Sequence, residues 1–386
     1  MLLQQRYLYT PGPTPVPDRV KHAMNAPMIG HRSDQFPSLL TDVANRLQTV
    51  FGSKSPVLLI AGTGTAALET AAANVIHEGD NVIVIVTGAF GERFASICET
   101  FGARVHRLQI EWGKSCSAEQ LEDYIRQNDL SFSAVFATYC ETSTGVLNPI
   151  QDLARIAKEK TNALFIVDGV SCIGAVPVDM EGWGIDLLVS GSQKALMLPP
   201  GLAFIALSSQ ARSAIQRNTS KRFYLDLNKY INSFESESST PFTPALSLIY
   251  GAREVCSMIE EEGFEQVISR HQVLKEMTRA GLKALHLPLL ASDEDASPTI
   301  TAVIPGEGEA AAIKQHMQAA FHIELAEGQG KLKNRIFRMG HMGYSTPFDI
   351  LKALSALEMT VRHISGRDDA LGMAVKRAEE VWMQHV

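Results

Sequence analysis

Lys194 is the residue with the clearest capacity for covalent chemistry. It follows the apolar stretch 185–189 and stands among small residues in 190–194 (Ser-Gly-Ser-Gln-Lys). Such a stretch is typical of a buried strand, and a lysine at its end can point into a pocket. Burial disfavours the charged ammonium, so the side chain loses its proton easily and becomes a nucleophilic amine, as a Schiff-base lysine requires. A lysine in a surface turn is the ordinary alternative, and its position alone does not exclude it.

Two further elements could complete a cofactor site. Asp168 ends the apolar stretch 163–167, and a carboxylate at the C-terminal edge of a parallel sheet lies where such folds bind ligands. It could instead cap the segment that follows. The turn 61–65 (Ala-Gly-Thr-Gly-Thr) separates another apolar stretch from a predicted helix. Free backbone N–H groups and the positive end of a helix dipole make such a turn a good seat for a phosphate.

A protein that binds pyridoxal 5'-phosphate needs a lysine, a carboxylate and a phosphate-binding turn, and the sequence offers all three. Asp168 would keep the pyridine nitrogen protonated, so that the ring can accept electrons from the substrate. The competing interpretation is a dinucleotide site, because the glycine-rich turn fits that fingerprint loosely. That fold expects an acidic residue at the end of its second strand, which here ends at Thr87. We therefore favour a single phosphate, and predict pyridoxal phosphate as the cofactor.

Three more side chains suit such a site. Phe90 could stack on the cofactor ring, or it could be a core phenylalanine at a helix start. Thr142 could bond the phenolic oxygen of the cofactor, or serve as a turn hydroxyl. Arg338 stands inside the apolar stretch 335–339, where an arginine is costly without an anionic partner. Its planar guanidinium matches a carboxylate, so we expect it to hold the α-carboxylate of an amino acid; an internal salt bridge is the alternative.

The elements that would position these residues alternate along the chain. Short apolar stretches with strand character are separated by stretches with helical spacing. This alternation indicates an α/β fold with a mostly parallel sheet that is covered on both faces. The predicted strands are 57–60, 82–86, 105–110, 134–139, 163–167, 185–189 and 202–207, and the predicted helices are 36–51, 66–77, 90–101, 118–127 and 150–159.

The remaining segments suggest two domains and an arm, as expected for 386 residues. Residues 1–20 are rich in proline and predict an extended N-terminal arm, and 21–262 would form the large domain. Within it, 208–262 is more polar, and we expect an irregular, functional loop there. Helices near 264–284, 308–320 and 347–363, with strands at 299–304 and 335–339, predict a smaller C-terminal α+β domain over 263–386.

Composition excludes several classes of protein. Apolar residues make up 45% and charged residues 20%, and the net charge of −7 speaks against a nucleic-acid partner. No apolar stretch approaches the roughly 20 residues of a membrane helix, and the N-terminus lacks a secretory apolar core, so we expect a cytoplasmic protein. The cysteines form no zinc or redox-pair pattern, and we predict reduced thiols and no metal site. They are Cys98, Cys116, Cys140, Cys172 and Cys256.

The motifs, taken in their order, resemble the class V pyridoxal-phosphate-dependent aminotransferases, most closely the alanine–glyoxylate and serine–pyruvate aminotransferase group. The lysine segment 190–196 with 199–201 is the most specific match, and the resemblance extends from 11–13 to Arg338. The other matching segments are 30–32, 62–69, 141–145 and 167–171. The mammalian members carry Trp where Phe90 stands and His where Thr65 stands. The resemblance implies a fold-type I transferase and a homodimer with active sites at the subunit interface.

The resemblance also implies roles for individual residues. Lys194 would be the cofactor lysine and proton carrier, and Asp168 the partner of the pyridine nitrogen. Arg338 and Gly30 would bind the substrate, and Phe90 would stack on the cofactor. The phosphate would lie among Thr63, Gly64, Thr65 and Ser192; the phenolic oxygen would contact Thr142 and Gln193; and Thr240 or Thr243 would reach the phosphate of the neighbouring subunit.

The implied activity is a ping-pong transamination from a small amino acid, of the alanine or serine type, to glyoxylate or pyruvate. A phosphoserine aminotransferase is the main alternative, because basic residues for a substrate phosphate are available in His31, Arg32, Lys331 and His341. A cysteine desulfurase is less favoured, because it needs a nucleophilic cysteine on a mobile loop. Cys256, the single cysteine after Lys194, stands in a helical pattern. A non-catalytic binding protein and a nucleotide-dependent oxidoreductase are further alternatives.

Overall fold

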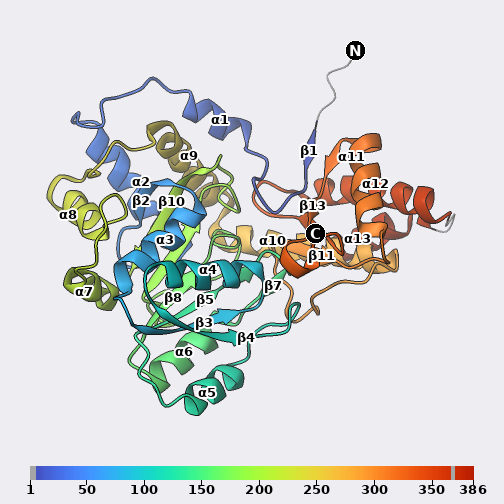
Figure 1. Cartoon of the computed structure of the whole chain (residues 1–386). Helices are drawn as coiled ribbons and strands as arrows, with labels where there is room; N and C mark the ends of the chain where they lie inside the picture. Colours follow the sequence, from blue (N-terminus) through green and yellow to red (C-terminus); the bar gives the residue numbers. More distant parts are fainter. Residues whose placement is uncertain (1–5, 367–369) are drawn as a thin grey trace.

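The computed structural model describes residues 6–366 and 370–386. Its centre is a seven-stranded sheet with the strand order β2-β10-β9-β8-β5-β3-β4 (Figure 1). All neighbours are parallel except β10, which runs antiparallel to both β9 and β2. The predicted α/β class with a mostly parallel sheet is confirmed. The strands are β2 (Leu58–Gly62), β3 (Asn81–Val86), β4 (Arg104–Gln109), β5 (Ala134–Thr138), β8 (Leu164–Asp168), β9 (Leu187–Gly191) and β10 (Gly201–Leu207).

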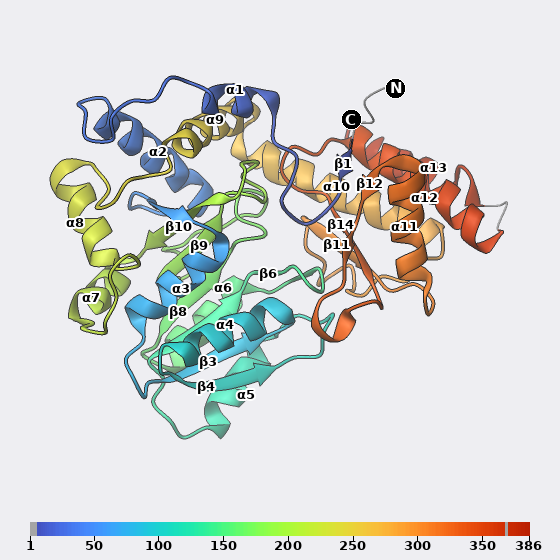
Figure 2. The same cartoon turned by 45° about the horizontal axis from the view of Figure 1, so that its top comes forward.

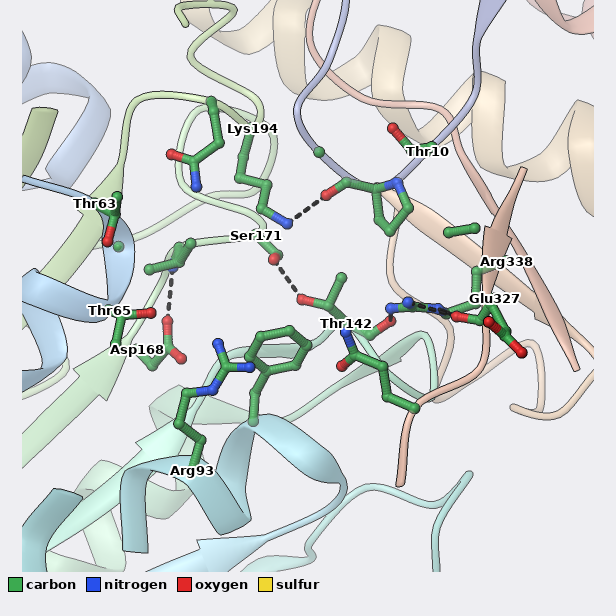
Figure 3. Close-up of a pocket in the computed structure, with 18 of the residues that line it drawn as sticks. Thr10, Thr63, Thr65, Arg93, Thr142, Asp168, Ser171, Lys194, Glu327 and Arg338 are labelled. Atoms are coloured by element: carbon green, nitrogen blue, oxygen red, sulfur yellow. Dashed lines mark hydrogen bonds between the residues drawn. The ribbon is translucent and has the colours of Figure 1, made fainter. Parts of the chain in front are cut away.

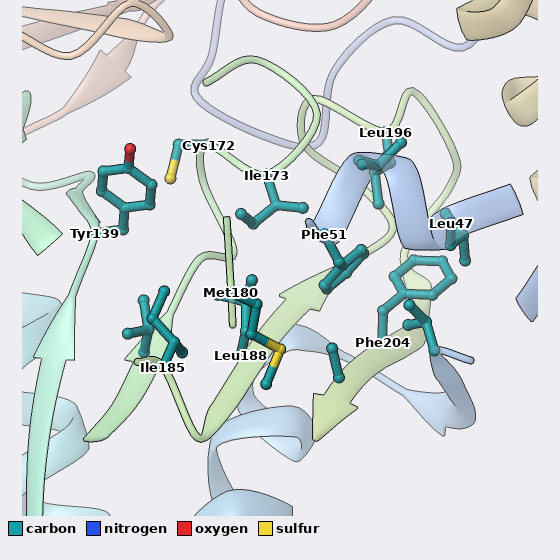
Figure 4. Packing of buried hydrophobic residues seen from close by; sticks show 14 of the residues in the cluster. Leu47, Phe51, Tyr139, Cys172, Ile173, Met180, Ile185, Leu188, Leu196 and Phe204 are labelled. Atoms are coloured by element: carbon teal, nitrogen blue, oxygen red, sulfur yellow. The ribbon is translucent and has the colours of Figure 1, made fainter. Parts of the chain in front are cut away.

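Helices cover both faces of this sheet because successive strand residues point to opposite sides. Leu58 and Ile60 of β2 pack with α3 (Gly64–Val75), α4 (Ala89–Thr100) and later helices, whereas Leu59 packs with the cluster on the other face. That second cluster includes α2 (Phe36–Phe51), α5 (Ala118–Gln127) and α6 (Ile150–Lys160). Figure 4 shows Leu47 and Phe51 of α2 against Phe204 of β10. Each predicted strand and helix up to residue 207 is present within a few residues of its predicted bounds.

The expectation of an irregular segment over 208–262 is wrong. This region forms three helices: α7 (Ser209–Arg217), α8 (Leu227–Glu237) and α9 (Leu246–Glu262). The side chains of Ser208 and Asp226 accept hydrogen bonds from the first turns of α7 and α8, which defines where these helices begin. These helices carry polar residues on their outer faces and an apolar stripe that packs on the sheet, so the sequence as a whole looked too polar for helices.

The C-terminal part contains a second, antiparallel sheet with the order β11-β14-β13. Figure 2 shows this sheet and its helices (orange to red) beside the large sheet. Helix α13 is absent from the predictions; Ala374 and Ala378 bury its inner face in the cluster of the neighbouring helices. The elements are α10 (Phe264–Ala284), β11 (Ile300–Val303), α11 (Glu309–Phe321), β12 (Ile323–Glu324), β13 (Ala326–Glu327), the 3-10 helix η1 (Gly330–Leu332), β14 (Phe337–Gly340), α12 (Pro347–Ser365) and α13 (Met373–Trp382).

The N-terminal segment joins the two parts of the chain. Strand β1 (Tyr7–Leu8) pairs in parallel with β12, and helix α1 (Asp18–Met24) lies against α9. The stretch between them, 9–17, contains no helix and crosses the C-terminal edge of the large sheet (Figure 2). A short hairpin, β6 (Cys140–Glu141) with β7 (Val146–Leu147), stands at the same edge. Among the described residues, no helix combines the length and apolar character needed to cross a lipid bilayer.

Candidate active site

The C-terminal edge of the parallel strands opens into a cavity of about 450 Å³. Because parallel strands all end at this edge, residues far apart in sequence meet there (Figure 3). Nine of the residues expected at a cofactor or substrate site line the cavity: Thr63, Gly64, Thr65, Phe90, Thr142, Asp168, Gln193, Lys194 and Arg338.

One end of the cavity is formed by the start of α3. Thr63 is in extended conformation and its side chain caps no amide of the helix. In the described part of the chain, the N–H groups of Gly64, Thr65 and Ala66 donate to no protein acceptor. A Cβ atom on Gly64 would lie 2.9 Å from Val170 Cγ1, so glycine lets the turn approach the loop after β8 closely. Free amides at a helix N-terminus form a cradle for an anion such as phosphate.

Asp168 is held at the end of β8 by strand pairing on both sides, with β5 and β9. Its carboxylate accepts a 2.9 Å hydrogen bond from the Val170 N–H, the single protein donor that it has among the described residues. Burial raises the pKa of Asp168 to about 7, although the positive charges of Lys194 and Arg93 oppose that rise. A buried carboxylate with unused acceptor capacity fits a cationic partner in the cavity, such as a protonated pyridine nitrogen.

Lys194 leaves β9 through Gly191 and points back into the cavity. Its backbone is fixed by two bonds to its own carbonyl oxygen: the Thr14 hydroxyl donates at 3.0 Å and the Met197 N–H at 3.0 Å. The side chain is buried, and its Nζ donates to the Pro11 carbonyl oxygen. Burial first, and then the nearby Arg338, lower the pKa of Lys194 to about 8. At pH 7 about one tenth of this lysine is therefore a neutral, nucleophilic amine, far more than of a lysine with the ordinary pKa of 10.5.

Phe90 and Thr142 are positioned by the hairpin at the sheet edge. The buried Glu141 carboxylate accepts hydrogen bonds from the Phe90 and Gly91 N–H groups and so fixes the start of α4. The Thr142 and Ser171 hydroxyls lie 2.5 Å apart and face the cavity. Gln193 Oε1 is buried and has no hydrogen-bond partner among the described residues. An unpaired buried acceptor calls for a donor, which a bound molecule in the cavity could supply.

Arg338 forms the opposite end of the cavity. Its Nε and Nη2 donate to the Glu327 carbonyl oxygen at 2.9 and 2.7 Å, and its Nη1 donates to the Thr142 carbonyl oxygen at 2.9 Å. These bonds use three of five N–H groups, so one remains on each terminal nitrogen. No described carboxylate pairs with this guanidinium, so the expected alternative of an internal salt bridge is not found there. Burial lowers the pKa of Arg338 to about 10. The two N–H groups that remain unused on its terminal nitrogens suit the two oxygens of a carboxylate.

Four expected site residues lie elsewhere. The Ser192 hydroxyl donates to the Pro199 carbonyl and accepts from the Leu202 N–H, which places it behind the lysine loop. Gly30 stands in an exposed loop, outside the cavity of its own chain. Thr240 and Thr243 line a separate small crevice. Strand and loop patterns identify the edge of the sheet, but they do not tell which loop side chains turn toward the cavity.

Several lining residues were not expected, above all Arg93 and Pro11. The Arg93 guanidinium lies 4.7 Å from the centre of the Phe90 ring and near Asp168 (Figure 3). Its position three residues after Phe90, on the same face of a predicted helix, was the signal that could have identified it. Pro11 and Ser171 carried no such signal, because the arm and the loop after β8 reach the cavity only through tertiary packing.

The chain that forms this cavity matches a known family over most of its length. The model of the aminotransferase class-V family matches residues 6–339. The chain belongs to the class-V aminotransferases. This aminotransferase is therefore an enzyme of a family that depends on pyridoxal phosphate, and its architecture is that of the fold-type I transferases.

The similarity between this aminotransferase and known proteins extends over nearly its whole length. It is 40% identical to a protein named soluble hydrogenase, small subunit, from a Synechococcus species, with 97% of each chain covered. It is 34% identical to the serine–glyoxylate aminotransferase of Methylorubrum extorquens, over 92% of this chain and 91% of that one. The solved structure of ureidoglycine–glyoxylate aminotransferase from Bacillus subtilis superposes with a TM-score of 0.91 at 31% identity, with 99% of both chains covered.

Proposed function

We propose that this aminotransferase uses pyridoxal phosphate to move an amino group from a small amino acid, of the alanine or serine type, to glyoxylate or pyruvate. The observation that carries the proposal is a single cavity with Lys194 and Asp168 at its centre. The free amides of α3 lie at one end, and the two unused N–H groups of Arg338 at the other. The relatives named for glyoxylate support this choice of acceptor.

The position of each residue in the cavity suggests its role in the proposed reaction. The bound cofactor would supply an electron-accepting ring that stabilises the carbanion formed when the substrate loses its α-proton. Asp168 would keep the ring nitrogen protonated, and Phe90 would pack on the ring face. The amine of Lys194 would take the α-proton and deliver it to the carbonyl carbon of the cofactor, while Arg338 would orient the substrate by its carboxylate.

The size and charge of the cavity favour small donors. A volume of about 450 Å³ has to hold both cofactor and substrate, which leaves little room for a long side chain. None of the basic residues that a phosphoserine substrate would have used lines this cavity. Arg32 instead donates to Ser239 at 3.0 Å, and both ring nitrogens of His341 are hydrogen-bonded inside the fold. The phosphoserine alternative is therefore less supported.

We also propose that the enzyme works as a homodimer in the cytoplasm, with Thr243 or Thr240 reaching the phosphate of the partner subunit. An aromatic patch beside these threonines supports a protein interface: Phe223 is 71% exposed, Tyr224 is 40% exposed, and both rings lie against Phe242. The Tyr224 hydroxyl donates to the Ala61 carbonyl, next to the phosphate cradle. Exposed aromatic clusters of this kind mark contact surfaces.

The proposal is tested with purified enzyme. Alanine, serine, aspartate and phosphoserine are each paired with glyoxylate, pyruvate and 2-oxoglutarate, and initial rates are compared. We expect alanine or serine with glyoxylate or pyruvate to give the highest kcat/KM. A kcat/KM that is highest for phosphoserine with 2-oxoglutarate would contradict the substrate assignment. Borohydride reduction should attach the cofactor to the peptide that contains Lys194, and attachment elsewhere would contradict the site.

A further inference from the structure

The N-terminal arm lies directly on the side chain of Lys194. The Pro11 carbonyl oxygen accepts a hydrogen bond from Lys194 Nζ, as the dashed line in Figure 3 shows. Three residues later, the Thr14 hydroxyl donates to the Lys194 carbonyl at 3.0 Å and the Thr14 N–H donates to the Gln193 carbonyl at 3.2 Å. The arm therefore holds both the backbone and the terminal amine of this lysine.

The same arm contacts the strand that carries Arg338. The Gly340 N–H donates to the Tyr9 carbonyl at 2.6 Å, and a Cβ atom on Gly340 would collide with the Thr10 carbonyl. Gly340 stands two residues after Arg338 in β14. Residues 9–14 thus pass between the lysine loop of the large sheet and the strand of the small sheet that holds the carboxylate clamp.

We propose that residues 9–14 are a positioning element for Lys194, in which the Pro11 carbonyl holds the free amine while it carries a proton and Gly12 keeps the lysine chain in line. This inference rests on the proposed function, because it concerns the phase in which Lys194 acts as a free base. It names Pro11 and Gly12 as positioning residues for that proton transfer.

A backbone carbonyl suits this task chemically. A neutral amine has two N–H groups and one lone pair, so a carbonyl can accept one N–H while the lone pair stays free to take a proton. The carbonyl also accepts from the protonated form, with a stronger, charge-assisted bond, so the nitrogen can gain and lose a proton without changing partner. A carboxylate at this place would instead stabilise the ammonium form and raise the pKa of Lys194, so that less of the lysine would be a neutral amine able to take a proton.

Gly12 is required at this place for two steric reasons. Its φ of +121° lies in a region that residues with a side chain rarely adopt. A Cβ atom there would also lie 2.5 Å from Lys194 Cδ, 2.7 Å from Cε and 2.9 Å from Nζ. Any side chain at position 12 would therefore displace the arm, the lysine, or both.

The test compares Gly12→Ala with a matched control, Gly308→Ala. Gly308 also has a positive φ, +79°, but a Cβ atom there would meet nothing within 4 Å. Both glycines have a positive φ, that of Gly308 in the left-handed αL region and that of Gly12 beyond it, and only Gly12 lies against Lys194. Two measurements are made: the pH titration of Lys194 in the full chain freed of cofactor, by trace acetylation and peptide mass spectrometry, and single-turnover kinetics of the holoenzyme with alanine.

In the wild type we expect the acetylation midpoint of Lys194 near its pKa of about 8. Gly12→Ala should move this midpoint by about half a unit or more. It should also slow the single-turnover rate about 10- to 100-fold, because a small misplacement of a reacting group has that effect, while KM changes less than about twofold. Gly308→Ala should leave midpoint and rate at the wild-type values.

A Gly12→Ala enzyme with the wild-type midpoint and rate would overturn the proposal, and so would equal effects in Gly308→Ala. If Gly12→Ala does not fold, Thr14→Val takes its place. This variant removes the hydrogen bond to the Lys194 carbonyl oxygen and should also move the acetylation midpoint of Lys194, by a smaller amount than is expected for Gly12→Ala. An unchanged midpoint in Thr14→Val would then overturn it. Should the wild type transfer no amino group from any donor, the proposed function fails, and the acetylation titration still decides on the arm.

Discussion

The two edges of the large sheet each carry a buried aspartate and a lysine, and they use them in opposite ways. At the amino edge, Asp186 precedes β9 and accepts from the Phe165 N–H at 2.8 Å, from the Ser208 hydroxyl at 2.8 Å and from Lys158 Nζ. At the carboxyl edge, the Asp168 carboxylate accepts from the Val170 N–H alone among the residues that the structure describes. Both aspartates are 3% exposed, so burial does not distinguish them. The difference lies in how many partners the fold supplies.

The C-terminal part of the chain shows the same contrast between two arginines, Arg279 of helix α10 and Arg338 of strand β14. Arg279 is 5% exposed and pairs with the Asp293 carboxylate at 2.7 Å. Arg338 is 4% exposed, and within the described part of the chain its guanidinium donates to backbone carbonyls only. When buried charged groups are paired, the interaction with the partner offsets the free energy that they lose by leaving water. Charged groups left short of partners are destabilising in the free chain and available to a ligand, which is consistent with the proposed site at the carboxyl edge.

The largest effect on activity is expected from the lysines. Lys194→Ala should lower kcat by about ten thousandfold or more, because it removes the group that moves the proton. Lys158→Ala, the matched change at the other edge, should lower the thermal unfolding temperature and leave kcat of the folded enzyme near the wild-type value. Rate assays and calorimetry on both variants check this. A Lys194→Ala enzyme that still attaches cofactor under borohydride would refute the assignment.

Asp168→Asn should separate activity from stability. The amide keeps an acceptor for the Val170 N–H but loses the negative charge, so we expect kcat to fall by about 100- to 1,000-fold. At pH 8 the cofactor-free chain should unfold at a higher temperature than the wild type, because the raised pKa of Asp168 shows that its ionised form is disfavoured in the folded state. A variant with normal turnover would contradict the role of this carboxylate.

Arg338→Ala tests the carboxylate clamp. Loss of a buried, charged hydrogen bond costs about 2–5 kcal/mol, so kcat/KM for alanine should fall by about 30- to 4,000-fold, mainly through KM. Arg279→Ala, a change to the buried arginine of helix α10, is the control and should change stability rather than KM. The measurement is steady-state kinetics over a range of donor concentrations, and an unchanged KM in Arg338→Ala would exclude the clamp.

Asp186→Asn should have the opposite effects to Asp168→Asn, with lower stability and nearly unchanged activity. It weakens the pairing with Lys158, so we expect the free energy of unfolding to fall by about 2–4 kcal/mol. The kcat of the folded fraction should remain close to that of the wild type, because Asp186 stands at the edge remote from the cavity. Denaturant unfolding followed in parallel with activity checks this. Stabilisation by Asp186→Asn would contradict the contrast between the two edges.

The smallest effect concerns pH. The pKa of Asp168 is raised from 3.8 to about 7, so between these values the folded chain holds a proton that the unfolded chain has lost. Stability contributed by protonated Asp168 is therefore lost as the pH rises toward 7. The difference in unfolding temperature between Asp168→Asn and the cofactor-free wild type should grow from pH 5 to pH 7 and then level off. A difference that is constant over this range would argue against the raised pKa.

Local pattern predicted the elements that carry the chemistry. Apolar strands alternating with helices indicated the parallel sheet, and strand ends at Asp168 and Lys194 indicated its active edge. The lysine segment identified the family that the comparisons confirm. The helices over 209–262 were missed because their polar outer faces obscured a buried stripe. Ser192 was placed at the phosphate by resemblance, whereas its hydroxyl is taken up by the Pro199 carbonyl and the Leu202 N–H.

The sequence alone determined the order of strands and helices along the chain and the types of residue at the strand ends, because side-chain periodicity and turn residues act over a few neighbours. It placed Asp168 at the carboxyl end of its strand and Asp186 at the start of the next one, but it did not show how many hydrogen-bond partners each has. Tertiary structure decided which one is fully paired, and it brought Pro11, Arg93 and Ser171 into the cavity. Partners of a buried charge come from distant segments, and packing alone brings those together.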